Sequence, residues 1–107
     1  MILDIWHVNH GGIDYTEITH IPKQYIISVE LNDADKQQVC TMMEDTINRR
    51  KLCGQGDFDI PGFIRSILKT GYDGPFGVEI LSEQLRMQPL EIAARESFMT
   101  AMSQFSK

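Results

Sequence analysis

Three carboxylates stand near the ends of three apolar runs of the chain. The runs span residues 1–6, 25–31 and 76–81. Their carboxylates are Asp4, Glu30 and Glu79. Alternate side chains of a strand point to opposite faces, so each carboxylate lies opposite its apolar neighbours. If the runs are adjacent parallel strands, all three carboxylates converge on one side of one end of a sheet.

Such a convergence favours a metal site. Ionised carboxylates are costly to bury together and raise one another's pKa, and a divalent cation removes that cost. His7 follows Asp4 by three residues and could face the same pocket. Oxygen ligands with one imidazole suit Mn²⁺, Mg²⁺, Co²⁺ or Zn²⁺. We therefore expect Asp4, Glu30 and Glu79 to be metal ligands; the alternative is that each is solvated or paired with Lys or Arg.

A basic segment is the second candidate site. Arg49, Arg50 and Lys51 run into the Gly-x-Gly turn of residues 54–56. Cations beside backbone N–H groups could bind a phosphate, a carboxylate or sugar hydroxyls, although a solvated loop is an equal alternative. The chain has no HEXXH, GxSxG, GxGxxG or P-loop sequence, so metalloprotease, serine hydrolase, Rossmann and NTPase assignments lack their motifs.

The elements that must position these residues read as an α/β fold. Segments of helical pattern separate the three apolar runs, which indicates βα units and a parallel sheet. Helices are expected over residues 14–20, 36–44, 60–70 and 89–105. Asp59 is the expected N-cap of the third helix and Gly71 its stop. The last helix carries an apolar stripe expected to face the core: Leu90, Ala93, Ala94, Phe98, Ala101, Met102 and Phe105.

Composition limits the class of protein. The chain has 107 residues, 42% of them hydrophobic, with 15 acidic and 10 basic residues and a net charge of -5, which suits one globular domain. Its acidic balance argues against nucleic acid or anionic membranes as partners. No run of about 18 apolar residues predicts a membrane span, and no secretory signal is recognised. Cys40 and Cys53 are expected to be free thiols, with the cytoplasm as the expected location.

Four ordered segments together resemble the xylose isomerase-like TIM-barrel superfamily, the sugar phosphate isomerases and epimerases. They are Asp4–His7, Val29–Asp33, Arg50–Asp59 and Gly71–Leu81. They resemble the ends of strands six and seven, the loop that opens helix seven, and strand eight. The resemblance implies that residues 1–107 are the C-terminal part of such a barrel: three consecutive βα units of a (β/α)8 fold, with parallel strands.

The resemblance also implies roles for single residues. Asp4 and Glu79 would be metal ligands, and Glu79 would also be the catalytic acid/base. His7 and Arg50 would contact substrate oxygens. Glu30 stands where the family commonly has a metal-binding histidine; it could still be a ligand, or it could signal an altered or absent metal.

The implied function is a metal-dependent isomerase or epimerase that acts on a small sugar or keto-polyol through an enediolate. A dehydratase acting beside a keto group is an alternative from the same superfamily. Since a barrel needs eight βα units, the isolated chain is expected to be incomplete and inactive alone. It would then self-associate or pair with the missing N-terminal barrel portion. The other alternative is an inert fragment, or half of a split barrel.

Overall fold

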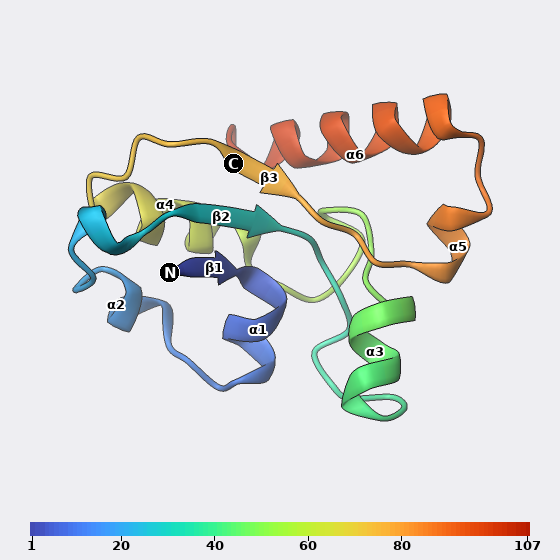
Figure 1. Cartoon of the computed structure of the whole chain (residues 1–107), viewed down its shortest axis with the longest axis horizontal. Helices are drawn as coiled ribbons and strands as arrows, with labels where there is room; N and C mark the ends of the chain where they lie inside the picture. The colour runs from blue at the N-terminus through green and yellow to red at the C-terminus, as the bar shows by residue number, and fades with distance from the viewer.

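Three short parallel strands form the single sheet of the computed structural model, which describes residues 1–107. The strands are β1 (Ile2–Asp4), β2 (Ser28–Leu31) and β3 (Phe76–Val78), in the order β1-β2-β3. Both neighbouring pairs run parallel, and all three arrows in Figure 1 point toward the end where α1, α3 and α5 lie. The expected parallel α/β arrangement is therefore confirmed.

The register of the strands decides which side chains share a face. Asp4 is the partner of Glu30, and Glu30 is the partner of Gly77. One residue earlier, Leu3 is the partner of Val29. Because paired residues of a sheet point to the same side, Asp4 and Glu30 share one face and Leu3 and Val29 share the other.

Six α-helices accompany the sheet. They are α1 (Ile5–His10), α2 (Tyr15–Ile18), α3 (Met42–Asn48), α4 (Ile60–Lys69), α5 (Glu83–Arg86) and α6 (Leu90–Gln104). A 3-10 turn spans Lys23–Tyr25. No helix is both long and apolar enough to cross a membrane.

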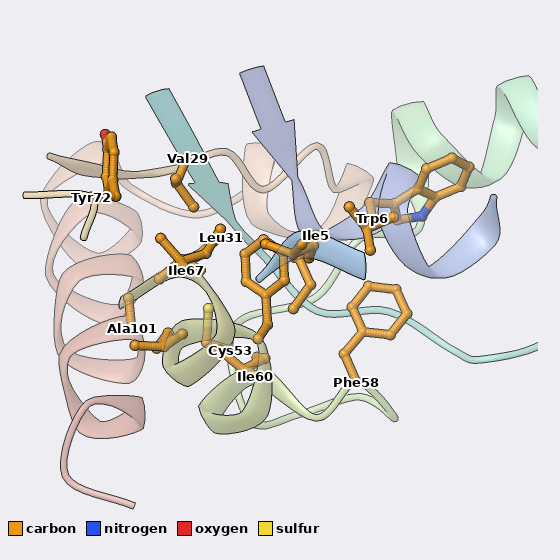
Figure 2. Close-up of a cluster of buried hydrophobic side chains, with 14 of the residues drawn as sticks. Ile5, Trp6, Val29, Leu31, Cys53, Phe58, Ile60, Ile67, Tyr72 and Ala101 are labelled. Atoms are coloured by element: carbon orange, nitrogen blue, oxygen red, sulfur yellow. The ribbon is translucent and has the colours of Figure 1, made fainter. Parts of the chain in front are cut away.

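Helix α4 forms as its sequence predicts and supplies much of the core. The Asp59 carboxylate accepts the N–H of Gly62, and the chain leaves the helix through Gly71, whose φ is 86°. Its inward side chains pack with strand and loop residues in one apolar cluster, part of which Figure 2 shows. The buried helix residues are Ile60, Phe63, Ile64 and Ile67.

Several predicted boundaries are wrong. The second run is a strand only from Ser28 and the third only to Val78, and capping explains two further differences. The first apolar run ends as a strand at Asp4, because its carboxylate caps α1 and residues 5–10 are helical. The helix expected over 36–44 begins at Met42, because Thr41 is its N-cap and accepts the N–H of Glu44. Helix α5 was not expected at all.

Helix α6 has the expected boundaries but not the expected burial. Of its apolar stripe only Ala101 is buried, whereas Leu90 is 84% exposed and Phe98 64% exposed. The helix lies beside β3 (Figure 1), and most of its apolar stripe is exposed. A helical apolar face therefore remains largely uncovered in this chain.

Candidate functional site

Asp4 lies where the sequence places it, but its carboxylate already has three partners. Oδ1 accepts the backbone N–H of Trp6 at 2.8 Å and the side-chain amide of Asn32 at 3.0 Å. Oδ2 accepts Nη1 of Arg50 at 2.9 Å. Both charged side chains are buried, so Asp4 serves here as a helix cap and as the anion of an internal ion pair.

Arg50 is the central cation of the site. It is only 3% exposed. Its Nη1 donates to the Glu79 carbonyl at 3.3 Å as well as to Asp4. Nε and Nη2 donate to the carbonyl and the hydroxyl of Thr46, at 3.0 and 2.7 Å. A guanidinium has five N–H donors, so at most one remains for another ligand. Arg50 also lies over the Trp6 ring, 5.5 Å from its centroid.

Glu30 is a half-buried carboxylate without a cation of its own. It takes part in none of the four ion pairs. Its carboxylate leans over Gly77, where any Cβ would collide with Oε2. Burial raises the pKa of Glu30, and the charges of Glu79 and Asp4 raise this pKa further, while Arg50 acts against them. The strand register places Asp4 beside Glu30, and Glu79 two residues after Gly77, so the three carboxylates of the predicted site belong to one face of the sheet.

Glu79 closes the group at the end of β3. Its backbone N–H donates to the carbonyl of Leu31 at 3.1 Å, so strand-like contact continues one residue past Val78. Its side chain is exposed and in no ion pair. An exposed carboxylate beside the half-buried Glu30 is accessible to a ligand approaching this face of the sheet.

His7 lies apart from this group. It is an exposed residue of α1, with its ring centroid 5.1 Å from that of Trp6. It donates no hydrogen bond to Asp4, whose three donors are Trp6, Asn32 and Arg50. The structure thus keeps His7 at the same end of the sheet without bringing it to the carboxylates.

The basic segment is paired within the chain rather than free. Asp35 receives the Arg49 guanidinium at 3.4 Å and the Lys51 ammonium at 2.7 Å. These pairs and hydrogen bonds hold the pKa of Asp35 below its ordinary value, with the Lys51 hydrogen bond the largest cause. The cations therefore fasten the segment to the loop that follows β2.

Sequence reasoning missed two residues of the site. Asn32 is fully buried; its amide donates to Asp4, and its Oδ1 has no partner. Trp6, 1% exposed, supports the Arg50 guanidinium. A polar residue directly after the apolar run of β2 was the available signal for Asn32. No local pattern indicates the contact of Trp6 with a residue so distant in sequence.

The donor set of this chain limits what it can hold. No group of three His, Cys, Asp or Glu side chains is placed to hold a metal ion. Asp4 is neutralised by Arg50, which leaves Glu30 and Glu79 as the two carboxylates without a cation. Chemically, this face offers two oxygen ligands or proton acceptors beside a buried guanidinium.

Three known proteins show what the chain resembles. It is 35% identical over 89 residues to 3-dehydroshikimate dehydratase of Pseudomonas putida, covering 83% of this chain and 14% of that protein. A solved xylose isomerase-like TIM barrel/4-hydroxyphenylpyruvate dioxygenase fusion protein is 31% identical with a TM-score of 0.85, over 96% of this chain and 16% of that one. The zinc-containing crystal structure of the IOLI protein has a TM-score of 0.88 at 18% identity, over 99% of this chain and 37% of that one.

The chain therefore spans about one seventh of the length of the curated relatives it matches. The family profile described as xylose isomerase-like TIM barrel matches residues 1–101, which is nearly all of the sequence. The parallel sheet with flanking helices agrees with that architecture. The chain belongs to the xylose isomerase-like TIM-barrel family.

Proposed function

We propose that this chain forms part of the active site of a lyase that removes water from a keto-polyol acid of the 3-dehydroshikimate class. The observation that carries the proposal is the group of Glu30 and Glu79, two carboxylates without a cation at the carboxyl end of a parallel sheet. Barrel enzymes build their sites at this end. The name of the Pseudomonas putida relative supports dehydration in particular.

Glu79 is the residue proposed to move the proton. A C–H bond beside a keto group is acidic enough for a carboxylate to take its proton. The electron pair of that bond forms a carbon–carbon double bond, and the hydroxyl on the next carbon leaves as water with the proton that Glu79 has taken up. Glu79 suits this role because its carboxylate is exposed on the site face and is bound by no cation. The Arg50 guanidinium, which donates to the Glu79 carbonyl, is proposed to keep a positive charge beside the site.

The two free carboxylates fit a divalent cation of the Mn²⁺, Co²⁺, Mg²⁺ or Zn²⁺ type, since carboxylate oxygens suit such ions. Glu30 and Glu79 would hold the cation, and further ligands would have to come from barrel segments outside this chain. A bound cation would polarise the keto oxygen of the substrate. Asp4 stays a predicted ligand, but in the present arrangement its role is to hold Arg50. The substrate contacts predicted for His7 and Arg50 also remain proposals.

The test is turnover of 3-dehydroshikimate by the full-length protein that carries this segment. Glu79→Gln is expected to reduce kcat by about 10²–10⁴-fold, the usual contribution of a general base. Glu83→Gln, the same change at an exposed position of α5, is the matched control and should keep kcat within about twofold of the parent. Full turnover by the Glu79→Gln protein would overturn the proposed role.

Isomerisation or epimerisation of a small sugar is the second candidate, because the family profile is xylose isomerase-like. It begins with the same proton removal, but the proton returns to the substrate and the product keeps the substrate's mass. A dehydratase releases a product lighter by one water. Mass spectrometry of the product therefore separates the two reactions.

The proposed activity also needs the rest of a barrel. β1 and β3 are edge strands, each paired on one side only, and Ile2 on the site face is 64% exposed. Unpaired edges favour association with further strands. We propose that the partner of this chain is the remainder of the barrel, and co-purification with that segment tests the pairing; self-association of the chain is the competing outcome.

A further inference from the structure

We propose that Asp33 is a positioning residue whose carboxylate organises the loop from Arg50 to Asp59 and so holds the Arg50 guanidinium in the site. The inference concerns the geometry of the site; its relevance to catalysis rests on the proposed function. The hydrogen bonds of the Asp33 carboxylate go to Ala34 and to the loop of residues 54–58, not to Glu30 or Glu79. No role was predicted for its side chain. Its test is independent of any activity.

The Asp33 carboxylate accepts four backbone N–H groups. Oδ2 accepts those of Gly54 at 2.9 Å and Gly56 at 3.0 Å. Oδ1 accepts those of Phe58 at 3.0 Å and Ala34 at 2.9 Å. Asp33 is fully buried and in no ion pair, so peptide dipoles rather than a side-chain cation stabilise its charge. The loop is thus wrapped around one anion.

The glycines of the loop permit this close approach. A Cβ on Gly56 would lie 2.5 Å from both the Ala34 carbonyl oxygen and Asp33 Oδ1. Gly54 has a φ of 92°, a left-handed conformation that other residues rarely adopt. The Gly-x-Gly turn, predicted from sequence as a candidate anion site, therefore binds an anion of the chain itself.

Backbone pairing connects this turn to Arg50. Asp33 donates its N–H to the Lys51 carbonyl at 3.0 Å, and Lys51 donates its N–H to the Asp33 carbonyl at 2.7 Å. Arg50 itself donates its N–H to the Leu81 carbonyl at 3.1 Å. Asp33 therefore fixes the chain on both sides of Leu52, and this fixes the point from which the Arg50 side chain reaches Asp4.

The test is amide and guanidinium hydrogen exchange, followed by NMR in the full chain. In the parent protein the amides of Gly54, Gly56 and Phe58 and the Arg50 Nε–H are expected to exchange at least about tenfold more slowly than free groups, because each is hydrogen-bonded. Exchange of these loop amides at the rate of free groups would overturn the proposal without any mutation.

Asp33→Asn then separates positioning from general stability. The amide replaces one acceptor oxygen by an N–H₂ group that cannot accept, so the loop amides and the Arg50 Nε–H should both exchange about tenfold faster or more. Amides of α4 should keep their protection. The matched control is Asp57→Asn in the same loop, whose carboxylate accepts only the exposed N–H of Lys36; it should leave Arg50 exchange unchanged.

Each result of the exchange measurements either supports or contradicts the positioning role of Asp33. Faster exchange at the loop amides with unchanged exchange at Arg50 Nε–H would show a structural role only and would overturn the positioning role. Equal acceleration in α4 and the loop would also contradict it, since it would show global loss of the fold. Because no outcome depends on turnover, the proposal can fail while the proposed function stands, and the reverse is equally possible.

Discussion

The buried pair of Arg50 and Asp4 gives the sharpest energetic prediction. Replacing Arg50 by methionine, which keeps much of the side-chain volume, should lower the free energy of unfolding by about 3–5 kcal/mol. The physical reason is that Asp4 would remain buried with a negative charge beside Glu30 and without a cation. Since small domains are stable by only about 5–15 kcal/mol, the variant should lose a large fraction of the stability of the chain.

The magnitude follows from the geometry. The charged atoms lie 2.9 Å apart, and the two side chains are only 3% and 9% exposed. At an effective dielectric constant of about 20, the attraction is about 6 kcal/mol before desolvation is subtracted. Asp4→Asn should be less harmful, because Arg50 keeps its acceptors on Thr46 and the Glu79 carbonyl. The double variant should recover part of the loss, since no unpaired charge remains.

Urea titration measures the free energy of unfolding of each variant. Circular dichroism is the better signal, because Trp6 fluorescence would also respond to loss of the Arg50 cation above its ring. Arg49→Met is the matched control. Arg49 is the adjacent arginine, its side chain is 42% exposed, and it contacts Asp35 at 3.4 Å and Asp45 at 3.8 Å. Asp45 keeps its hydrogen bonds from the N–H groups of Val39 and Cys40 when Arg49 is replaced. Exposed pairs contribute about 0–1 kcal/mol, so this change should have little effect.

Two results would refute this account of the pair. One is an Arg50→Met protein that loses no more stability than Arg49→Met. The other is a double variant whose loss equals the sum of the single losses, because additivity would mean that the two charges do not interact.

Three further predictions concern single groups. Burial raises the pKa of Cys53 to about 12, so a thiol reagent at pH 8 should label only the exposed Cys40 in the folded protein. Labelling of Cys53 in a folded Cys40→Ser variant would contradict this. Asp59→Ala removes the N-cap of α4 and should lower the free energy of unfolding by about 1 kcal/mol, measured by urea titration; no change would show that the cap contributes nothing. Gly77→Ala should displace the Glu30 carboxylate and lower the pKa of Glu30, and an unchanged titration would place that carboxylate elsewhere.

Local sequence signals were sufficient for much of the fold. The three apolar runs predicted the strands, and the helical segments between them predicted their parallel direction. Asp59 and Gly71 predicted the ends of α4, because capping depends on residues within one turn of the helix terminus.

The wrong boundaries came from local signals that were not weighed. Asp4 was interpreted only as a strand residue, but it is also the N-cap of α1. Thr41 followed three residues later by Glu44 is the capping-box pattern, and it marks the true beginning of α3. In both cases the boundary of the element follows the capping side chain and not the apolar periodicity.

The contacts of the site could be predicted only in part. Strand alternation placed Asp4, Glu30 and Glu79 on one face, and the electrostatic coupling of Glu30 to the other two agrees with this. The partner of Asp4 could not be found in this way. Arg50 is 46 residues away, and its approach depends on how the loop after α3 folds around Asp33.

The burial of α6 was misjudged for a different reason. An apolar stripe shows that a helix can bury one face, but it does not show what covers that face. Phe98 and Met102 are 64% and 50% exposed because few elements of this chain reach them. Sequence periodicity therefore predicted the helix correctly and the burial of its apolar stripe wrongly.

The raised pKa of Glu30 makes stability depend on pH in a definite direction. Ionisation is less favourable in the folded chain than in the unfolded one, whose reference value is 4.5. The stabilising contribution of protonated Glu30 is complete below pH 4.5 and is lost as the pH rises through its folded pKa. Glu30→Gln should therefore raise stability at pH 7, and the gain should disappear in acid.

The most direct test of a shared carboxylate site is the titration of the Glu30 carboxyl carbon by NMR, in the parent chain and in Glu79→Gln. The parent should show a pKa above 4.5, and removal of the Glu79 charge should lower it, because that charge is one cause of the shift. A Glu30 that titrates at its ordinary value, and does not respond to the loss of Glu79, would contradict the claim that these strands bring their carboxylates into one site.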